Sequence, residues 1–290
     1  MAGARTAPKG RKPVWQEVEE AEAKKVSSRV RAARQDQKRK GRRYRVVYDT
    51  SGPKVRLGIL WFFVVLGAIA IGPLAVALVY GGAAAVAAGQ TARVWRKRRL
   101  RPNEQVAMVV AGGMGLGATL GAGGAGLVCI AGAIMAYVTA TGDRRSPHPA
   151  IVDAGSTLQC ALPPGLVALS MVLLTRLDQG SAIALLLLVS AYETGDYLVG
   201  SGARNPYEGP AAGGSAIVVV TFILSTLPIS ALDFGQAWAF GGAVLLLAPL
   251  GQLLASAILP AAAAPASALR RLDSLLLAAP LWAWGVGLVI

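Results

Sequence analysis

The sequence predicts an all-α, polytopic integral membrane protein with about nine transmembrane helices and a basic, cytoplasmic N-terminal arm. Of its 290 residues, 54% are hydrophobic and only 15% are charged. The charges are unevenly placed, because 17 of the 29 Lys and Arg residues precede Leu57. After Leu57 the chain consists of apolar stretches, several of them longer than the ~20 residues that cross a bilayer. This composition excludes a soluble globular protein and a small disulfide-stapled secreted domain.

We assign residues 1–55 to the basic arm and residues 56–290 to a transmembrane domain. From Val14 to about Lys40, apolar residues recur at helical spacing but form only a thin stripe. This pattern favours a solvated juxtamembrane helix, or one lying on anionic lipid. Aromatic residues are too sparse among these basic residues to indicate nucleic-acid binding. No signal peptide is visible, so we expect a cytoplasmic N-terminus.

Two apolar stretches, Leu57–Ala88 and Val106–Ala140, are each too long for one span. A single helix across the first would place basic residues on both sides of the membrane, which the positive-inside rule disfavours. We therefore expect each stretch to form two helices, with breaks at Gly72 and Pro73 and near Gly121. The five remaining spans are Thr157–Leu174, Ser181–Val199, Gly213–Ile229, Phe234–Leu259 and Ser274–Ile290.

The distribution of basic residues supports this nine-span topology. It leaves 28 of the 29 Lys and Arg residues on the cytoplasmic side, with Arg176 as the exception. The C-terminus is then outside, and the protein is a multi-pass protein of the cell membrane. No ionisable residue lies near the middle of an expected span, which argues against a proton-coupled transporter or pump.

Polar residues collect at the cytoplasmic ends of the sixth, eighth and ninth spans. Glu193 and Asp196 are three residues apart and therefore share one helix face. The other candidates are Ser201, Arg204, Asn205, Glu208, Ser256, Arg270, Arg271, Asp273 and Ser274. Such a set can hold a divalent cation between carboxylates and pair arginines with phosphates. The alternative is ordinary charge in cytoplasmic loops.

Two segments carry a resemblance to a known family. The first is Val189–Gly200, followed by Asn205–Gly209, and the second is Arg271–Pro280, which contains Leu-Asp-Ser and Ala-Ala-Pro. Their residues and order resemble the phosphatidate cytidylyltransferase (CDP-diacylglycerol synthase) family of integral membrane enzymes. The similarity spans roughly residues 56–290, mostly as a pattern of apolar stretches.

The sequence also departs from the family pattern. Ser201 stands where the family has a basic residue, Arg270 replaces the first Asp of the terminal motif, and Glu193 replaces an Asp. The family's Lys-Asp pair and Gly-His-Gly-Gly element are missing, because Pro260–Ala268 is an alanine-rich linker.

The resemblance implies a membrane-embedded transferase of phospholipid biosynthesis that converts phosphatidate and CTP to CDP-diacylglycerol and pyrophosphate. It implies Mg²⁺ held by the catalytic carboxylates Asp273, Glu193 and Asp196, and a homodimer. The implied substrate-binding residues are Ser201, Arg204, Asn205, Glu208, Ser256, Arg270, Arg271 and Ser274. Two alternatives remain open. One is a non-catalytic relative that binds lipid, nucleotide or a partner protein, and the other is a CTP-dependent transferase acting on another lipid.

Overall fold

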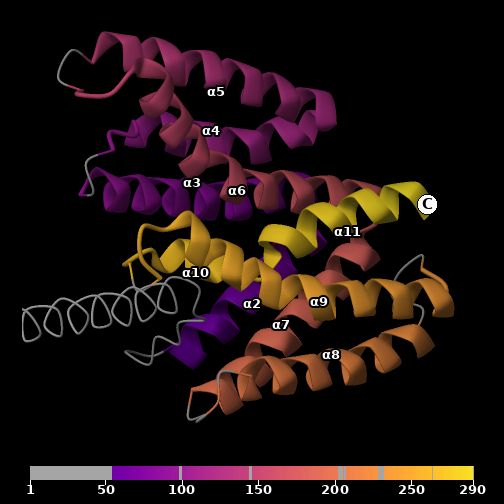
Figure 1. Cartoon of the computed structure of the whole chain (residues 1–290). Helices are drawn as coiled ribbons and strands as arrows, with labels where there is room; N and C mark the ends of the chain where they lie inside the picture. The colour runs from indigo at the N-terminus through magenta and orange to yellow at the C-terminus, as the bar shows by residue number, and fades with distance from the viewer. Residues whose placement is uncertain are drawn as a thin grey trace, which may run out of the picture. The chain divides into compact units, whose positions relative to one another are not determined.

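The structure, a computed structural model, describes residues 54–97, 100–143, 146–201, 205, 207–227, 232–262 and 264–289. All of them belong to the second of the two compact units into which the chain divides, Tyr44–Ile290. Every element in these ranges is a helix, which confirms the expected all-α class (Figure 1). The expected arm lies outside the described residues, except for Lys54 and Val55 at the start of the first helix.

The helices are α2 (Lys54–Ile71), α3 (Pro73–Arg96), α4 (Glu104–Gly117), α5 (Ala122–Gly142), α6 (Ala150–Leu177), α7 (Gln179–Gly200), α8 (Glu208–Thr226), α9 (Phe234–Ile258), α10 (Ser267–Leu272) and α11 (Leu275–Val289). A short 3-10 turn, η1 (Ala118–Leu120), follows α4. Figure 1 shows these helices running back and forth. Helices α3, α5, α7 and α9 end on one side, and α4, α6, α8 and α11 end on the other.

Both expected helix breaks are confirmed. Gly72 has φ 129° and Gly121 has φ 102°, backbone conformations that residues with a Cβ rarely adopt. Pro73 follows as the first residue of α3, where its missing N–H leaves no hydrogen bond unmade. Each apolar stretch therefore folds as two helices, as the distribution of basic residues predicts.

Seven helices in the described part are long and apolar enough to cross a membrane, with α10 and α11 taken together as Ser267–Val289. This confirms a multi-pass membrane protein. The other two expected spans form shorter helices: the apolar part of α2 is Arg56–Ile71, and α4 has 14 residues. At 1.5 Å per residue α4 is ~21 Å long, less than the ~30 Å hydrocarbon core. The count of nine spans thus stays a prediction.

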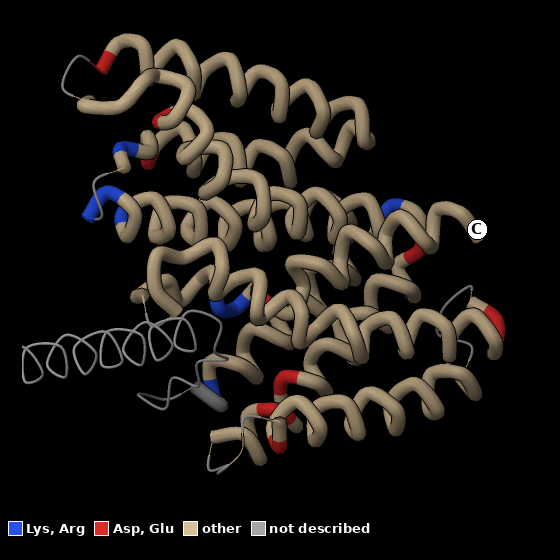
Figure 2. The backbone as a smooth tube through the Cα atoms, in the orientation of Figure 1, with Lys and Arg blue, Asp and Glu red and all other residues tan. Residues whose placement is uncertain are grey.

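Charge is concentrated at one end of the helices. Figure 2 shows most Lys and Arg of the described residues near the end where α3, α5, α7 and α9 finish. Arg176, at the end of α6, is the exception that the sequence anticipates. Its guanidinium donates to the carbonyls of Ala118, at 3.2 Å, and Thr119. These bonds therefore satisfy backbone carbonyls at η1, which terminates the short helix α4.

The core brings distant segments together. Helix α6 packs against α3, α4 and α5, while α11 packs against α6 and α9, and α7 packs along α8. The backbone carbonyl of Asp273 lies against Gly251 of α9, where any Cβ would collide with it. Glycine at 251 therefore lets the junction between α10 and α11 approach α9, and this contact positions the polar residues described next.

Candidate functional site

A buried polar cluster forms where α7, α9 and the α10–α11 junction meet. The hydroxyl of Ser274, between α10 and α11, donates a hydrogen bond to the carboxylate of Glu193 on α7. The backbone N–H of Ser274 donates to Oδ1 of Asp273 at 2.8 Å. Ser274 is fully buried and Asp273 is 8% exposed. The structure thus brings Glu193, Asp273 and Ser274 together, as the sequence predicts.

Asp196 joins the same cluster through Gln252 of α9. The Gln252 side-chain amide donates to Oδ2 of Asp196 at 3.2 Å, and its oxygen accepts the hydroxyl of Tyr192 at 3.3 Å. All three side chains are buried. Buried polar groups are costly unless they are hydrogen-bonded. This chain of bonds therefore lets α7 and α9 carry polar residues inside an apolar bundle.

Arg270 holds the turn between α9 and α10. Its guanidinium donates to the Ala262 carbonyl at 2.8 Å and to the Ser256 hydroxyl at 3.0 Å, and Nη1 lies 3.7 Å from Oδ2 of Asp273. Ser256 is fully buried. The sequence analysis assigns Ser256 and Arg270 to substrate binding, whereas in the structure both side chains form hydrogen bonds within the protein.

The side chain of Arg271 lies in a different environment from that of Arg270. Its side chain lies beside Gly58 of α2, and its positive charge acts on Glu193. It is partly buried, and the described residues contain no ion pair or hydrogen bond of its guanidinium. Of the two arginines, Arg271 is therefore the one whose guanidinium donors are all left for a phosphate.

Tyr80 of α3 is a buried polar residue that the sequence analysis missed. It is 1% exposed, and its hydroxyl has no hydrogen-bond partner among the described residues. The negative charge of Glu193 acts on this hydroxyl. An isolated tyrosine within the Gly- and Ala-rich Pro73–Arg96 stretch was the available signal. Gln252 of α9 was also missed as a site residue, although its side chain links Asp196 and Tyr192.

The loop between α7 and α8 contributes fewer residues to the buried cluster than the sequence predicts. Ser201 is exposed at the end of α7, and the Asn205 side chain donates to Glu208 at 2.9 Å on the surface. These contacts are local to the loop. Arg204 lies outside the described residues.

Among the described residues, no group of three or more His, Cys, Asp or Glu side chains is placed to hold a metal ion. Mg²⁺, however, is usually held in proteins by one or two carboxylates together with substrate phosphates. Glu193 and Asp273 influence each other electrostatically and meet at Ser274. Glu193 and Asp273 are therefore the carboxylates of the described residues that could contact such an ion.

Comparison with known proteins adds no assignment. No protein-family model matches the chain, and no curated protein matches it. The function therefore has to be argued from the cluster of Glu193, Asp196, Asp273 and Ser274 and from the two segments that carry it.

Proposed function

We propose that this protein is a membrane-embedded, CTP-dependent nucleotidyltransferase that converts phosphatidate and CTP to CDP-diacylglycerol and pyrophosphate. One observation carries the proposal. The two segments with the family resemblance, Val189–Gly200 and Arg271–Pro280, are far apart in sequence, yet Ser274 of one donates a hydrogen bond to Glu193 of the other. Three of the residues that the resemblance singles out, Glu193, Asp273 and Ser274, thus lie in one cluster at the charged end of the helices.

In the proposed reaction an oxygen of the phosphatidate phosphate attacks the α-phosphorus of CTP. The bond from that phosphorus to the β-phosphate oxygen breaks, and pyrophosphate leaves. Such transfers depend mainly on charge neutralisation and alignment. We assign phosphate binding to Arg271, while Arg270 positions Asp273 through their ion pair. Mg²⁺ bound to CTP, beside Glu193 and Asp273, would offset the repulsion between their carboxylates and the triphosphate.

The proposal requires the cluster to face the cytoplasm, since CTP is soluble there and the lipid is not. We propose nine membrane crossings, with α2 and α4 as the two short ones, a cytoplasmic N-terminus and an external C-terminus in the cell membrane. The concentration of basic residues at the end that carries the cluster supports this orientation. A homodimer remains part of the proposal through the family resemblance alone.

The test is an assay of purified full-length protein in lipid–detergent micelles with radiolabelled CTP, phosphatidate and Mg²⁺. We expect a CDP-lipid product that disappears when Mg²⁺ is chelated and in Asp273→Asn, which keeps the shape of the side chain. The matched control is Asp233→Asn, since Asp233 caps α9 at the opposite end of the bundle. Absence of product with folded wild-type protein and several lipid phosphates would refute the proposal.

A second candidate is a non-catalytic relative that binds lipid, nucleotide or a partner protein. The bonding of Arg270 favours it, because this guanidinium is engaged by Ala262, Ser256 and Asp273 instead of facing open space. The missing Lys-Asp and Gly-His-Gly-Gly elements point the same way. Binding of CTP without turnover would identify this case, and turnover with a polyprenyl phosphate in place of phosphatidate would identify a transferase for another lipid.

A further inference from the structure

Helix α10 has no N-terminal cap from its own N-cap residue. That residue is Ala266, whose side chain has no hydrogen-bonding atom. Ser, Thr, Asp and Asn are preferred at this position, because their side chains accept a backbone N–H of the first helical turn that has no partner within the helix. The first turn of α10 therefore needs an acceptor from another part of the chain.

Gln90 of α3 supplies that acceptor. Its Oε1 accepts the backbone N–H of Ala268, the second residue of α10, at 2.9 Å. Its Nε2 donates to the hydroxyl of Ser267, the first residue of α10, at 3.4 Å. The bond to Ala268 joins residues 178 positions apart, so no local sequence pattern predicts it. Gln90 thus acts as the N-terminal cap of a helix to which it does not belong.

The same end of α3 also holds the end of α9. The indole Nε1 of Trp95 donates at 2.9 Å to the carbonyl of Ile258, the last residue of α9. Carbonyls in the last turn of a helix have no partner within that helix. With Gln90 and Trp95, α3 therefore fixes both ends of the segment that connects α9 to α10.

The packing of α10 links this cap to the candidate site. Leu269 and Leu272 of α10 are fully buried, and α10 packs mainly against α3. Residues three apart share one face of a helix, so Arg270 and Arg271, which lie between these leucines, occupy its other faces. From there the positive charge of Arg271 acts on Glu193. The placement of α10 on α3 therefore determines where both arginines lie.

We propose that Gln90 is a positioning residue of this protein: its cap holds α10, and with it Arg271, where that arginine binds the phosphates of CTP. The inference rests on the proposed function, which assigns phosphate binding to Arg271. Helix α10 has only six residues. Because a helical turn takes ~3.6 residues, loss of the cap affects most of α10, and helices this short depend on support from the rest of the fold. Gln90 itself does not touch the substrate.

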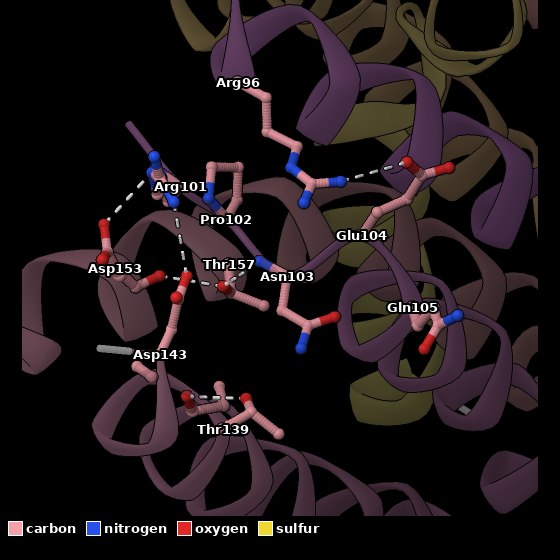
Figure 3. Close-up of a pocket in the computed structure, with 12 residues that line it drawn as sticks. Arg96, Arg101, Pro102, Asn103, Glu104, Gln105, Thr139, Asp143, Asp153 and Thr157 are labelled. Carbon is pink, nitrogen blue, oxygen red and sulfur yellow. Dashed lines mark hydrogen bonds and ion pairs between the residues drawn. The ribbon is translucent and has the colours of Figure 1, made fainter. Parts of the chain in front are cut away.

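The test compares Gln90→Met with Gln90→Glu in the full-length protein in detergent. Methionine has nearly the shape of glutamine but no acceptor for the Ala268 N–H, whereas glutamate keeps that acceptor. Hydrogen exchange across residues 268–272 should become about fivefold faster in Gln90→Met, as expected on losing one helix cap, and no faster in Gln90→Glu. The matched control is Gln105→Met, because Gln105 is exposed on α4 and makes no bond to the other residues drawn in Figure 3. Exchange in α6 shows whether each variant is folded.

Binding of CTP in the presence of Mg²⁺, measured by calorimetric titration, tests the link to Arg271. We expect the dissociation constant to rise about fivefold in Gln90→Met, the same factor as for the lost cap, and to stay near the wild-type value in Gln90→Glu. In an Arg271→Gln background, Gln90→Met should change it no further, because a positioning residue acts only through the residue that it positions. A purely structural role would weaken binding by the same factor in both backgrounds.

Unchanged exchange of residues 268–272 in Gln90→Met would overturn the cap. Equal effects of Gln90→Met on CTP binding with and without Arg271 would overturn the positioning role. A failure of the proposed function gives a different result: wild-type protein then neither binds nor turns over CTP, and the role of Gln90 in CTP binding fails with it. Faster exchange in Gln90→Met would still establish the cap in that case, because this readout does not involve CTP.

Discussion

The Ser274 hydroxyl donates a hydrogen bond to the Glu193 carboxylate across 81 positions of the sequence. Ser274 is fully buried, so this bond is made inside the helix bundle and not at its surface. It joins α7 to the junction between α10 and α11. This hydroxyl group therefore contributes both to the stability of that junction and to the placement of the Glu193 carboxylate.

Replacing that hydroxyl tests its importance. We expect Ser274→Ala to destabilise the protein by ~1–3 kcal/mol, because a partly buried carboxylate loses a donor. The measurement is the midpoint of thermal unfolding in detergent. The matched control is Thr194→Ala on α7, whose hydroxyl donates at 2.7 Å to the Ser190 carbonyl one turn away in its own helix. Equal shifts in the two variants would contradict the assignment.

The close approach of Gly251 to Asp273 gives a second prediction. Gly251→Ala places a methyl group against the Asp273 carbonyl, so α9 and the α10–α11 junction must separate. We expect a lowered unfolding midpoint and loss of CTP-dependent turnover, with a cost of about 1–3 kcal/mol for the overpacking. Gly242→Ala on the same helix is the control, because nothing lies within 4 Å of its added methyl group. A larger effect at 242 than at 251 would refute the argument.

The all-α class and the two helix breaks could be predicted from the sequence. Long apolar stretches require helices in a membrane, and Gly72, Pro73 and Gly121 are the residues that helices tolerate least. The lengths of α2 and α4 could not be predicted. Helix length within a bundle depends on packing and end-capping, such as the bonds from Arg176 to the carbonyls that end η1, and these involve residues distant in sequence.

The candidate site was partly predictable for a related reason. Carboxylates such as Glu193, Asp196 and Asp273 are rare enough in apolar helices to be noticed individually. Tyr80 was not, since a single tyrosine in an apolar helix resembles an ordinary core residue. Only the packing of α3 against its neighbours shows that the Tyr80 hydroxyl is buried without a hydrogen-bond partner among the described residues.

The two adjacent arginines should respond differently to substitution. Arg270→Gln removes donors to Ala262, Ser256 and Asp273, so we expect a lowered unfolding midpoint. Arg271→Gln removes no hydrogen bond within the described residues. We expect near-normal stability but a KM for CTP raised about tenfold or more, because a charge-assisted contact to phosphate is lost. Unfolding midpoints and steady-state kinetics separate the two effects. A raised KM in Arg270→Gln with unchanged stability would reverse the two assignments.

The orientation in the membrane gives the last prediction. With Cys129 and Cys160 replaced by alanine, single cysteines at Arg101 and Glu208 should react with an impermeant thiol reagent only after the cytoplasmic face is opened. A cysteine at Thr119, or one added after Ile290, should react in intact cells. The reason is that basic residues are retained on the cytoplasmic side of a membrane. Most Lys and Arg of the described residues lie near the end of the helix bundle that carries Arg101 and Glu208. Labelling at 208 in intact cells would place the Glu193 cluster near the outer surface, out of reach of cytoplasmic CTP, and would exclude the proposed transferase.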